Sequence, residues 1–203
     1  NLDAIRWIDN WPNWSHNSSG LNVVGPKSSG KTHLGSVWCS LSKAEWVNAP
    51  ITDGMRVPDI LKNGQHIVLD NFNHTWPGVP LLHLYNLVRE RKGFMLIISN
   101  IPVAQLGIAP DDLASRLSTM PVVAIKPPDD FLLKEVMLKL FKDRQIAVEN
   151  GVIDYLVVRM ERSFEEALRL VNLLDKAALA EKNRITIPLA SRGLRKEKEI
   201  NMD

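Results

Sequence analysis

The chain carries Gly25-Pro26-Lys27-Ser28-Ser29-Gly30-Lys31-Thr32, and this segment determines how the rest of the sequence is interpreted. It matches Gly-x-x-x-x-Gly-Lys-[Ser/Thr], the pattern of loops that hold nucleotide phosphates. Leu21–Val24 before it predicts a short strand, and His33–Cys39 after it has the apolar spacing of a helix. Such a loop requires this context, because its glycines let backbone N–H groups face phosphate oxygens and the helix N-terminus adds partial positive charge.

The motif assigns roles to individual side chains. We expect Lys31 to reach the β- and γ-phosphates and Thr32 to bind Mg²⁺. The alternative is a chance match in a chain that binds no nucleotide. The residues predicted to bind nucleotide in this segment are Gly25, Pro26, Lys27, Ser28, Ser29, Gly30, Lys31, Thr32 and His33.

Composition limits the classes of protein that fit. A length of 203 residues suits one or two domains, and the net charge is only +2, with acids and bases mixed along the chain. This is not the footprint of a dedicated nucleic-acid binder. No apolar run is long enough to span a membrane, and the single Cys39 cannot form an intrachain disulfide. We therefore expect a cytoplasmic protein that does not contact a membrane.

The order of predicted elements indicates an α/β fold of the P-loop type. Strands alternate with helices as far as Pro127, which predicts a parallel five-stranded sheet flanked by helices. From Asp129 onwards only helices are expected. The predicted domains are an α/β nucleotide-binding domain at residues 1–127, a small all-α domain at 128–190 and a charged flexible tail at 191–203.

An acid and an amide follow each other at the end of the predicted buried strand 66–71. Asp70 stands where the Walker B carboxylate that partners Mg²⁺ is found, although a turn or capping aspartate is the alternative. Asn71 stands where many ATPases of this architecture have a second acid that polarises the attacking water. An amide cannot take a proton, so we expect slow intrinsic hydrolysis. Asn73 and His74 are nearby alternatives for this role.

Three further polar residues are candidates for contact with phosphates. Asn100 ends another predicted strand, and either holds the γ-phosphate or the attacking water or simply forms the turn before Pro102. Arg116 is either a surface arginine or an arginine finger that reaches a neighbouring protein's nucleotide. Arg162, placed at a predicted helix N-terminus, opposes the helix dipole, which indicates either an anionic ligand or plain solvation. The predicted catalytic residues are Arg116, Asn71 and Asn100.

The first residues of the chain are rich in tryptophan, with Trp7, Trp11 and Trp14 close together. A short amphipathic helix is expected here, ended by Pro12. The tryptophans either pack against the edge of the domain or lie beside an adenine base.

Taken in chain order, these motifs resemble AAA+ ATPases of the DnaA type, and most closely the Hda family of regulators of bacterial replication initiation. The segment Asp112-Leu113-Ala114-Ser115-Arg116-Leu117 and the amide after Asp70 are similar to Hda rather than to DnaA. The stretch from Leu174 to Pro188 is also similar to the Hda lid. The resemblance covers roughly residues 21–188.

The resemblance implies a function and a set of partners. Hda, held on the DNA-loaded sliding clamp, promotes ATP hydrolysis by DnaA and so prevents re-initiation. It implies bound ADP or ATP with Mg²⁺ held by Thr32 and Asp70, and Asn100 as a sensor of phosphate. Arg116 would be a finger for the nucleotide of DnaA, and Arg162 a lid residue at the chain's own nucleotide. DnaA and the sliding clamp are the implied partners, and self-association stays open.

The sequence departs from the Hda pattern in places. Asn100 stands where Hda typically has Asp, which keeps a polar side chain but changes the charge. The short N-terminal clamp-binding motif of Hda is absent, and because the chain starts at Asn1 rather than Met, truncation is the preferred interpretation. No helix-turn-helix counterpart follows Pro188, so direct sequence-specific DNA binding is not expected.

Two other functions stay open at the level of the sequence. One is a DnaA-type or helicase-loader-type ATPase that acts directly on DNA or on the replicative helicase. The other is a P-loop nucleotide kinase or transport ATPase, which the helical segment after residue 128 and the segment around Arg116 disfavour.

Overall fold

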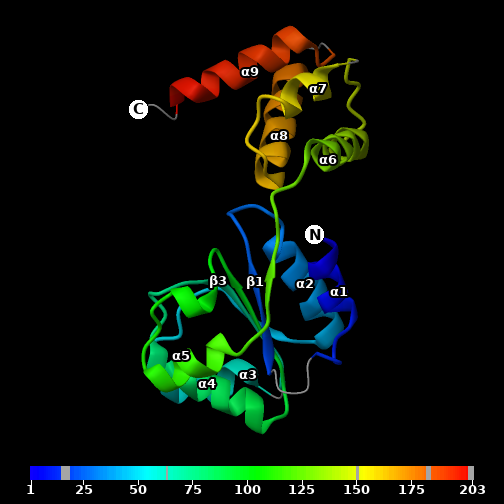
Figure 1. Ribbon diagram of the computed structural model, residues 1–203. Coiled ribbons are helices and arrows are strands. Elements are labelled where there is room, and N and C mark those ends of the chain that lie inside the picture. The colour runs from blue at the N-terminus through cyan, green and yellow to red at the C-terminus, as the bar shows by residue number, and fades with distance from the viewer. Residues whose placement is uncertain (15–18, 63, 150, 182–183, 201–203) are drawn as a thin grey trace. The chain divides into compact units, whose positions relative to one another are not determined.

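The computed structural model describes residues 1–14, 19–62, 64–149, 151–181 and 184–200 (Figure 1). The contacts within it divide the chain into two compact units, Asn1–Lys126 and Pro127–Asp203. The division falls at two consecutive prolines, Pro127 and Pro128, which lie in neither a helix nor a strand.

The first unit is built on a sheet whose five strands all run parallel. They are β1 (Gly20–Val24), β2 (Glu45–Val47), β3 (Ile67–Phe72), β4 (Met95–Ser99) and β5 (Val122–Ala124). Their order across the sheet is β2-β3-β4-β1-β5. Every residue of β1 and β4 is buried, as expected for strands covered on both faces. The predicted five-stranded parallel sheet flanked by helices is confirmed.

Helices cover both faces of this sheet. Side chains of α1 (Leu2–Asp9) and α2 (Lys31–Ser42) share one core cluster with the strands. Those of α3 (Val57–Leu61), α4 (Gly78–Glu90) and α5 (Asp111–Ser118) share the other, and Figure 1 shows the two sets on opposite sides. Because side chains alternate along a strand, Ile67 and Leu69 belong to one cluster and Val68 to the other. Two 3-10 turns, Gly54–Arg56 and Val103–Gln105, complete the unit.

The topology brings three loops to one edge of the sheet. Because parallel strands all end at the same edge, the segments after β1, β3 and β4 lie side by side there. The register pairs Val24 with Ser99 and Phe72 with Ser99, so these three strands end level with one another. The residues that follow them are the sequence-predicted site.

The second unit consists of helices around a core of its own. They are α6 (Asp130–Asp143), α7 (Val152–Val157), α8 (Phe164–Glu181) and α9 (Ile187–Ile200). Asp129 caps α6, because its carboxylate accepts a hydrogen bond from the Leu132 N–H at 2.8 Å. Leu133, Met137, Leu156, Leu170 and Leu174, all fully buried, are among the core residues.

Helix α9 includes most of the segment that the sequence analysis predicts as a charged flexible tail from residue 191. The helix runs without a break from Ile187 to Ile200, while residues 201–203 lie outside the described part. Pro188 suits a first helical turn, and Leu189 and Leu194 pack in or against the core of the unit. The sequence after Leu194 is rich in Lys and Glu, which are strong helix formers. The charged sequence of this segment is therefore compatible with a helix, and the predicted flexibility from residue 191 stays a prediction.

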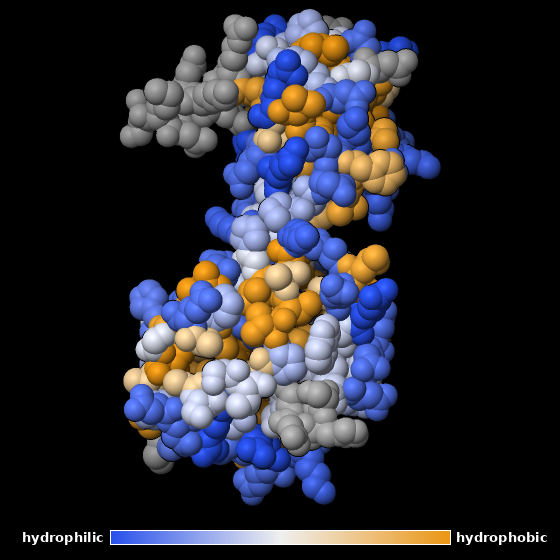
Figure 2. Space-filling model, viewed as in Figure 1, coloured by the Kyte–Doolittle hydropathy of each residue, from blue (hydrophilic) through white to orange (hydrophobic). Residues whose placement is uncertain are grey.

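Some apolar side chains reach the surface of both units (Figure 2). Phe131, Val158 and Leu179 in the second unit are each more than 70% exposed. Over the described ranges, no helix is both long enough and apolar enough to cross a lipid bilayer.

Candidate nucleotide site

The segment Gly25–Gly30 forms the loop that joins β1 to α2. A Cβ atom at Gly25 would collide with the backbone oxygen of Ile125, so the loop can leave β1 this closely only with glycine at that position. Gly30 is the N-cap of α2 and has φ 99°, a left-handed conformation that glycine adopts readily. The local sequence thus dictates a tight loop that ends at a helix N-terminus.

Lys31 lies at the centre of the site and is only 8% exposed. Its Nζ donates hydrogen bonds to the backbone oxygens of Gly25 at 2.8 Å and Pro26 at 2.7 Å. It also donates to Asn100 Oδ1 at 3.3 Å. Burial lowers the pKa of Lys31, and the nearby charge of Asp70 partly opposes that shift. The ammonium group is therefore partly desolvated and placed within the loop, where a nearby anion would favour its charged form.

Two features of the loop fit a bound phosphate. Ser29 is 2% exposed, and within the described part of the chain its Oγ has no hydrogen-bond partner. A buried hydroxyl without a partner is costly, and a phosphate oxygen would satisfy it. The first N–H groups of α2 also lack partners within the helix, as at any helix start. The residues present therefore fit an anionic ligand at this position.

Thr32 and Asp70 are brought together across the edge of the sheet. The Thr32 Oγ1 lies 3.2 Å and 3.4 Å from the two carboxylate oxygens of Asp70. Within the described ranges, no three His, Cys, Asp or Glu side chains gather as a metal site. A hydroxyl and one carboxylate fit Mg²⁺, which usually takes few protein ligands and completes its shell with phosphate oxygens and water.

Asn71 occupies an irregularity in β3. The register between β3 and β4 shifts between Leu69 and Phe72, and Asn71 has φ 55°. Asparagine tolerates this left-handed conformation better than most residues. The Asn71 N–H donates to Asp70 Oδ1 at 2.8 Å, and its side chain is exposed. Such bulges are common beside active sites, and this one orients the Asp70 carboxylate.

Asn22 is a contributor that the sequence reasoning missed. It is fully buried in β1, and its Nδ2 donates to Ser99 Oγ at 2.9 Å and to the Ile97 oxygen at 3.1 Å. Its Oδ1 accepts from the Val103 N–H at 3.0 Å. Asn100 lies between Ser99 and Val103 in the chain, so these bonds connect β1 to the residues on both sides of Asn100. An asparagine inside an otherwise apolar strand was the signal available in the sequence.

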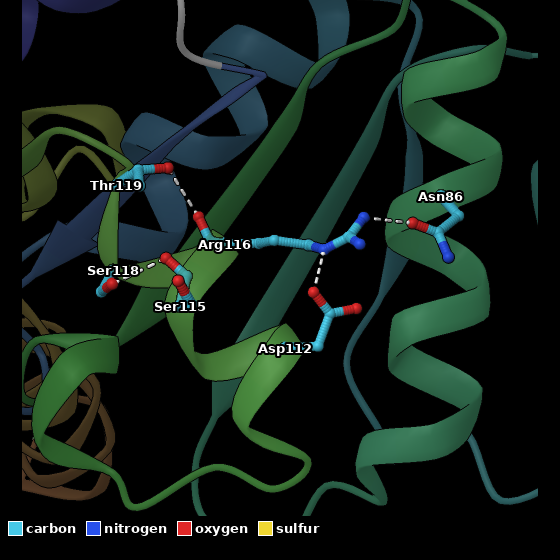
Figure 3. A network of polar contacts seen from close by, with 6 residues as sticks. All are labelled: Asn86, Asp112, Ser115, Arg116, Ser118 and Thr119. Carbon is cyan, nitrogen blue, oxygen red and sulfur yellow. Dashed lines mark hydrogen bonds and ion pairs between the residues drawn. The ribbon is translucent and has the colours of Figure 1, made fainter.

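Arg116 lies in α5, and the contacts described for it are with its own helix and with α4. Its Nε donates to Asp112 Oδ1 at 2.8 Å and its Nη1 to Asn86 Oδ1 at 2.8 Å (Figure 3). Its guanidinium carbon also lies 5.8 Å from the centre of the Tyr85 ring. The hydrogen bond with Asp112 raises the pKa of Arg116, so the side chain stays positively charged.

Arg162 belongs to the second unit and lies two residues before the start of α8. Its Nη2 lies 3.0 Å from Asp130 Oδ1, and its side chain is 63% exposed. Asp130, at the start of α6, thus supplies a negative partner for the charge that the sequence placed at a helix N-terminus.

The tryptophans of the N-terminal segment pack inside the first unit. Trp14 is 4% exposed and stacks on Trp38 of α2, with ring centres 5.5 Å apart. Trp11 contacts His66 and Trp38 edge-on at 5.4 Å and 6.1 Å. Of the two interpretations offered by the sequence, these contacts support packing.

The predicted site residues therefore fall into three places. Lys31, Thr32, Asp70 and Asn100 are brought together by direct contacts at the end of β1. Lys27 and His33 belong to the same loop and helix start, but their side chains are exposed. Their predicted contact with the nucleotide would therefore come from their backbone N–H groups. Arg116 forms a separate cluster with α4, and Arg162 lies in the other unit.

Comparison with known proteins identifies chains with a similar lid segment and a similar fold. Residues 134–194 match the family model described as Hda, lid domain. An uncharacterized protein of Haemophilus influenzae is 23% identical over 216 residues, which cover 94% of this chain and 86% of that protein. Domain III of the replication initiation protein DnaA from Thermotoga maritima superposes with a TM-score of 0.77 at 15% identity, covering 96% of this chain and 89% of that one.

This chain has the AAA+ fold with an Hda-type lid. The RuvB Holliday junction branch migration motor of Thermotoga maritima has the same fold, with a TM-score of 0.75 at 14% identity over 96% of this chain and 68% of that one. A crystal structure of a DNA replication initiation factor gives a TM-score of 0.72 at 16% identity, and its match covers 98% of this chain and 64% of its own length. The resemblance to Hda that the sequence indicated is confirmed for the lid segment 134–194, and the fold of the chain is shared with DnaA and RuvB.

Proposed function

We propose that this protein binds an adenine nucleotide with Mg²⁺ in the loop Gly25–Thr32 and promotes ATP hydrolysis by DnaA. Its site of action would be the DNA-loaded sliding clamp, and the result would be fewer repeated initiations. Two structures of DnaA are described as bound to the ATP analogue AMPPCP, which supports an adenine nucleotide in this fold.

One observation favours a regulatory role for this protein over the role of an ATPase that acts by itself. The phosphate loop, the Thr32–Asp70 pair and Asn100 are assembled, yet the residue after Asp70 is an exposed amide. An amide can orient water but cannot accept its proton, so the chain's own hydrolysis should be slow. Arg116 is charged, partly exposed and in contact with α4 and α5. A partly exposed cation of this kind can serve a nucleotide held by another protein.

In this proposal each residue has a limited task. Lys31 and the α2 N-terminus bind phosphate oxygens, and Thr32 and Asp70 hold the metal ion. Asn100 positions Lys31 or the γ-phosphate. When bound, Mg²⁺ would neutralise phosphate charge. Arg116 would stabilise charge that develops on the nucleotide of DnaA, a contribution worth about 10³- to 10⁵-fold for the arginine fingers of GTPases.

The test follows ATP hydrolysis by DnaA on clamp-loaded DNA with wild-type protein and with Arg116→Ala. We expect the wild type to stimulate hydrolysis and Arg116→Ala to lose most of that effect, while binding of ADP by the chain itself stays the same. Equal behaviour of the two proteins would refute the role of Arg116. Intrinsic turnover above about 1 per second, a rate typical of independent enzymes, would favour the alternative of a DnaA-type or loader-type ATPase.

A further inference from the structure

The Arg116 side chain is held by two polar partners and one ring, and Figure 3 shows the guanidinium lying between α5 and α4. Asp112, one turn earlier on α5, accepts from its Nε at 2.8 Å. Asn86 on α4 accepts from its Nη1 at 2.8 Å. Tyr85, also on α4, places its ring 5.8 Å from the guanidinium carbon.

We propose that Asp112 and Asn86 are positioning residues that hold the Arg116 guanidinium in the orientation in which it meets another protein's nucleotide. This inference rests on the proposed function, and it names the residues that make the arginine effective.

The elements that carry these partners are firmly anchored. Leu113 and Leu117, on either side of Arg116 in α5, are 0% and 1% exposed and belong to the same core cluster as Tyr85. The two acceptors therefore sit on helices fixed by the core. A guanidinium has five N–H donors in a rigid plane, and the two hydrogen bonds occupy two of them. Fixing two edges of that plane determines where the remaining donors point.

The energetics indicate that Asp112 and Asn86 orient Arg116 and do not keep it from the nucleotide of another protein. An arginine side chain loses much rotational freedom when it is immobilised at an interface, and holding it beforehand lowers that cost. The Arg116–Asp112 pair is partly exposed, with the two side chains 35% and 55% accessible. Ion pairs at such positions are weak, so Asp112 cannot withhold the cation from a triphosphate, which carries several negative charges. It can, however, select one orientation among many that the free side chain would sample.

The first measurement observes the arginine directly and needs no partner. In ¹⁵N-edited NMR spectra of the full chain, the Nε–H of Arg116, assigned by its loss in Arg116→Lys, should exchange with water slowly in the wild type. In Asp112→Asn it should exchange at least about threefold faster, because the charged acceptor is lost. Asp111→Asn is the matched control, since it removes the same charge from the same exposed helix start. Equal rates of Nε–H exchange in the wild type and in Asp112→Asn would overturn the proposal, because Asp112 would then not hold Arg116.

The second measurement is the rate of ATP hydrolysis by DnaA as a function of the concentration of this protein. Asp112→Asn and Asn86→Ala should lower the maximal rate by about three- to tenfold, the effect of a misplaced catalytic group, and leave the half-saturating concentration unchanged. Asp112→Glu keeps a carboxylate on the same helix face and should recover at least half of the wild-type rate. A merely structural effect would instead raise the half-saturating concentration or act equally in Asp111→Asn.

The outcomes separate this inference from the function on which it rests. Absence of stimulation by the wild type would refute the proposed function, and with it this inference. Stimulation that depends on Arg116 but is unchanged by Asp112→Asn and Asn86→Ala would overturn the inference alone. Greater stimulation by these variants would also overturn it, because the contacts would then restrain the arginine instead of positioning it.

Discussion

At the scale of single residues, Lys31 is the side chain on which the nucleotide site depends most. It is buried, its pKa is lowered by that burial, and its ammonium group is satisfied by the carbonyls of the loop itself. These carbonyls hold the ammonium group inside the loop, at the position where we propose that a phosphate binds. The site is thus organised around a desolvated cation, which interacts strongly with an anion.

Replacing Lys31 by alanine should weaken binding of Mg²⁺–ADP by about ten- to a hundredfold, the range for a hydrogen bond to a charged group. Isothermal titration calorimetry at constant ionic strength measures the change. Lys43→Ala is the control, because it removes an equal charge at the exposed opposite end of α2. Retained affinity in Lys31→Ala would contradict the assignment of the phosphate loop.

At the scale of elements, the link between β1 and β4 fixes the geometry of the site. Asn22 joins the strand that carries the phosphate loop to the segment that carries Asn100. The hydroxyl of Ser99 extends this link by donating to the Ile101 oxygen at 2.7 Å. Movement of Asn100 relative to Lys31 would therefore require breaking buried hydrogen bonds.

Replacing Asn22 by leucine should lower the free energy of unfolding by about 2–3 kcal/mol, because the Val103 N–H would stay buried without its partner. The backbone amide of Val103 should also exchange its hydrogen faster. Urea denaturation and hydrogen exchange measure the two effects. Ser118→Ala, at an exposed helix end, should change stability by less than about 0.5 kcal/mol. An unchanged Val103 exchange rate would show that Asn22 does not hold this loop.

A second element-scale prediction concerns the aromatic cluster beneath α2. His66 is buried among Trp11, Trp38 and Phe94, and its Nδ1 accepts a hydrogen bond from the Phe94 N–H at 3.0 Å. Burial lowers the pKa of His66, so the unfolded chain binds a proton at a higher pH than the folded one. Its contribution to stability is therefore complete above the ordinary histidine pKa near 6.5 and is lost as the pH falls through the folded pKa.

The free energy of unfolding should accordingly be lower at pH 5 than at pH 7.5, and the difference should shrink in His66→Gln. Glutamine keeps an acceptor but does not titrate, and the other histidines are the same in both proteins. Urea denaturation at the two pH values tests this. An equal pH dependence in both proteins would exclude His66 as its source.

The sequence predicted the elements better than their connections. The apolar runs of β1, β3 and β4 and the loop Gly25–Thr32 are local signals, and all of them lie where the pattern indicated. The bulge at Asn71 could not be predicted, because it appears only in the pairing of β3 with β4. The contacts of Arg116 with Asn86 were equally hidden, since 30 residues separate them in the chain. The charged composition after residue 191 did not indicate the helix α9, in which Leu194 packs against the core and Lys and Glu favour helix formation.

At the scale of the whole molecule, each unit has its own hydrophobic core. The core of the second unit draws its buried residues from Leu133 to Ala190, with Leu194 packed against it. This cluster is distinct from the two that line the sheet of the first unit. A unit with a complete core of its own is expected to fold independently.

A fragment of residues 127–203 should therefore show a helical circular dichroism spectrum and cooperative unfolding in urea. A fragment ending at residue 190 lacks most of α9, including Leu194, and should be markedly less stable. Comparison of their unfolding midpoints tests the boundary of the unit. Equal midpoints would mean that α9 beyond residue 190 adds nothing to the fold.

The central claim is that Lys31 and Arg116 serve two different nucleotides, one held by this protein and one held by DnaA. A single-turnover experiment tests it most directly, with ³H-labelled ADP bound to this protein and α-³²P-labelled ATP bound to DnaA on clamp-loaded DNA. We predict that Arg116→Ala retains the ³H label but leaves the ³²P-labelled ATP unhydrolysed, whereas the wild type retains the first and converts the second to ADP. Conversion of the ³²P label at the wild-type rate by Arg116→Ala would contradict the account.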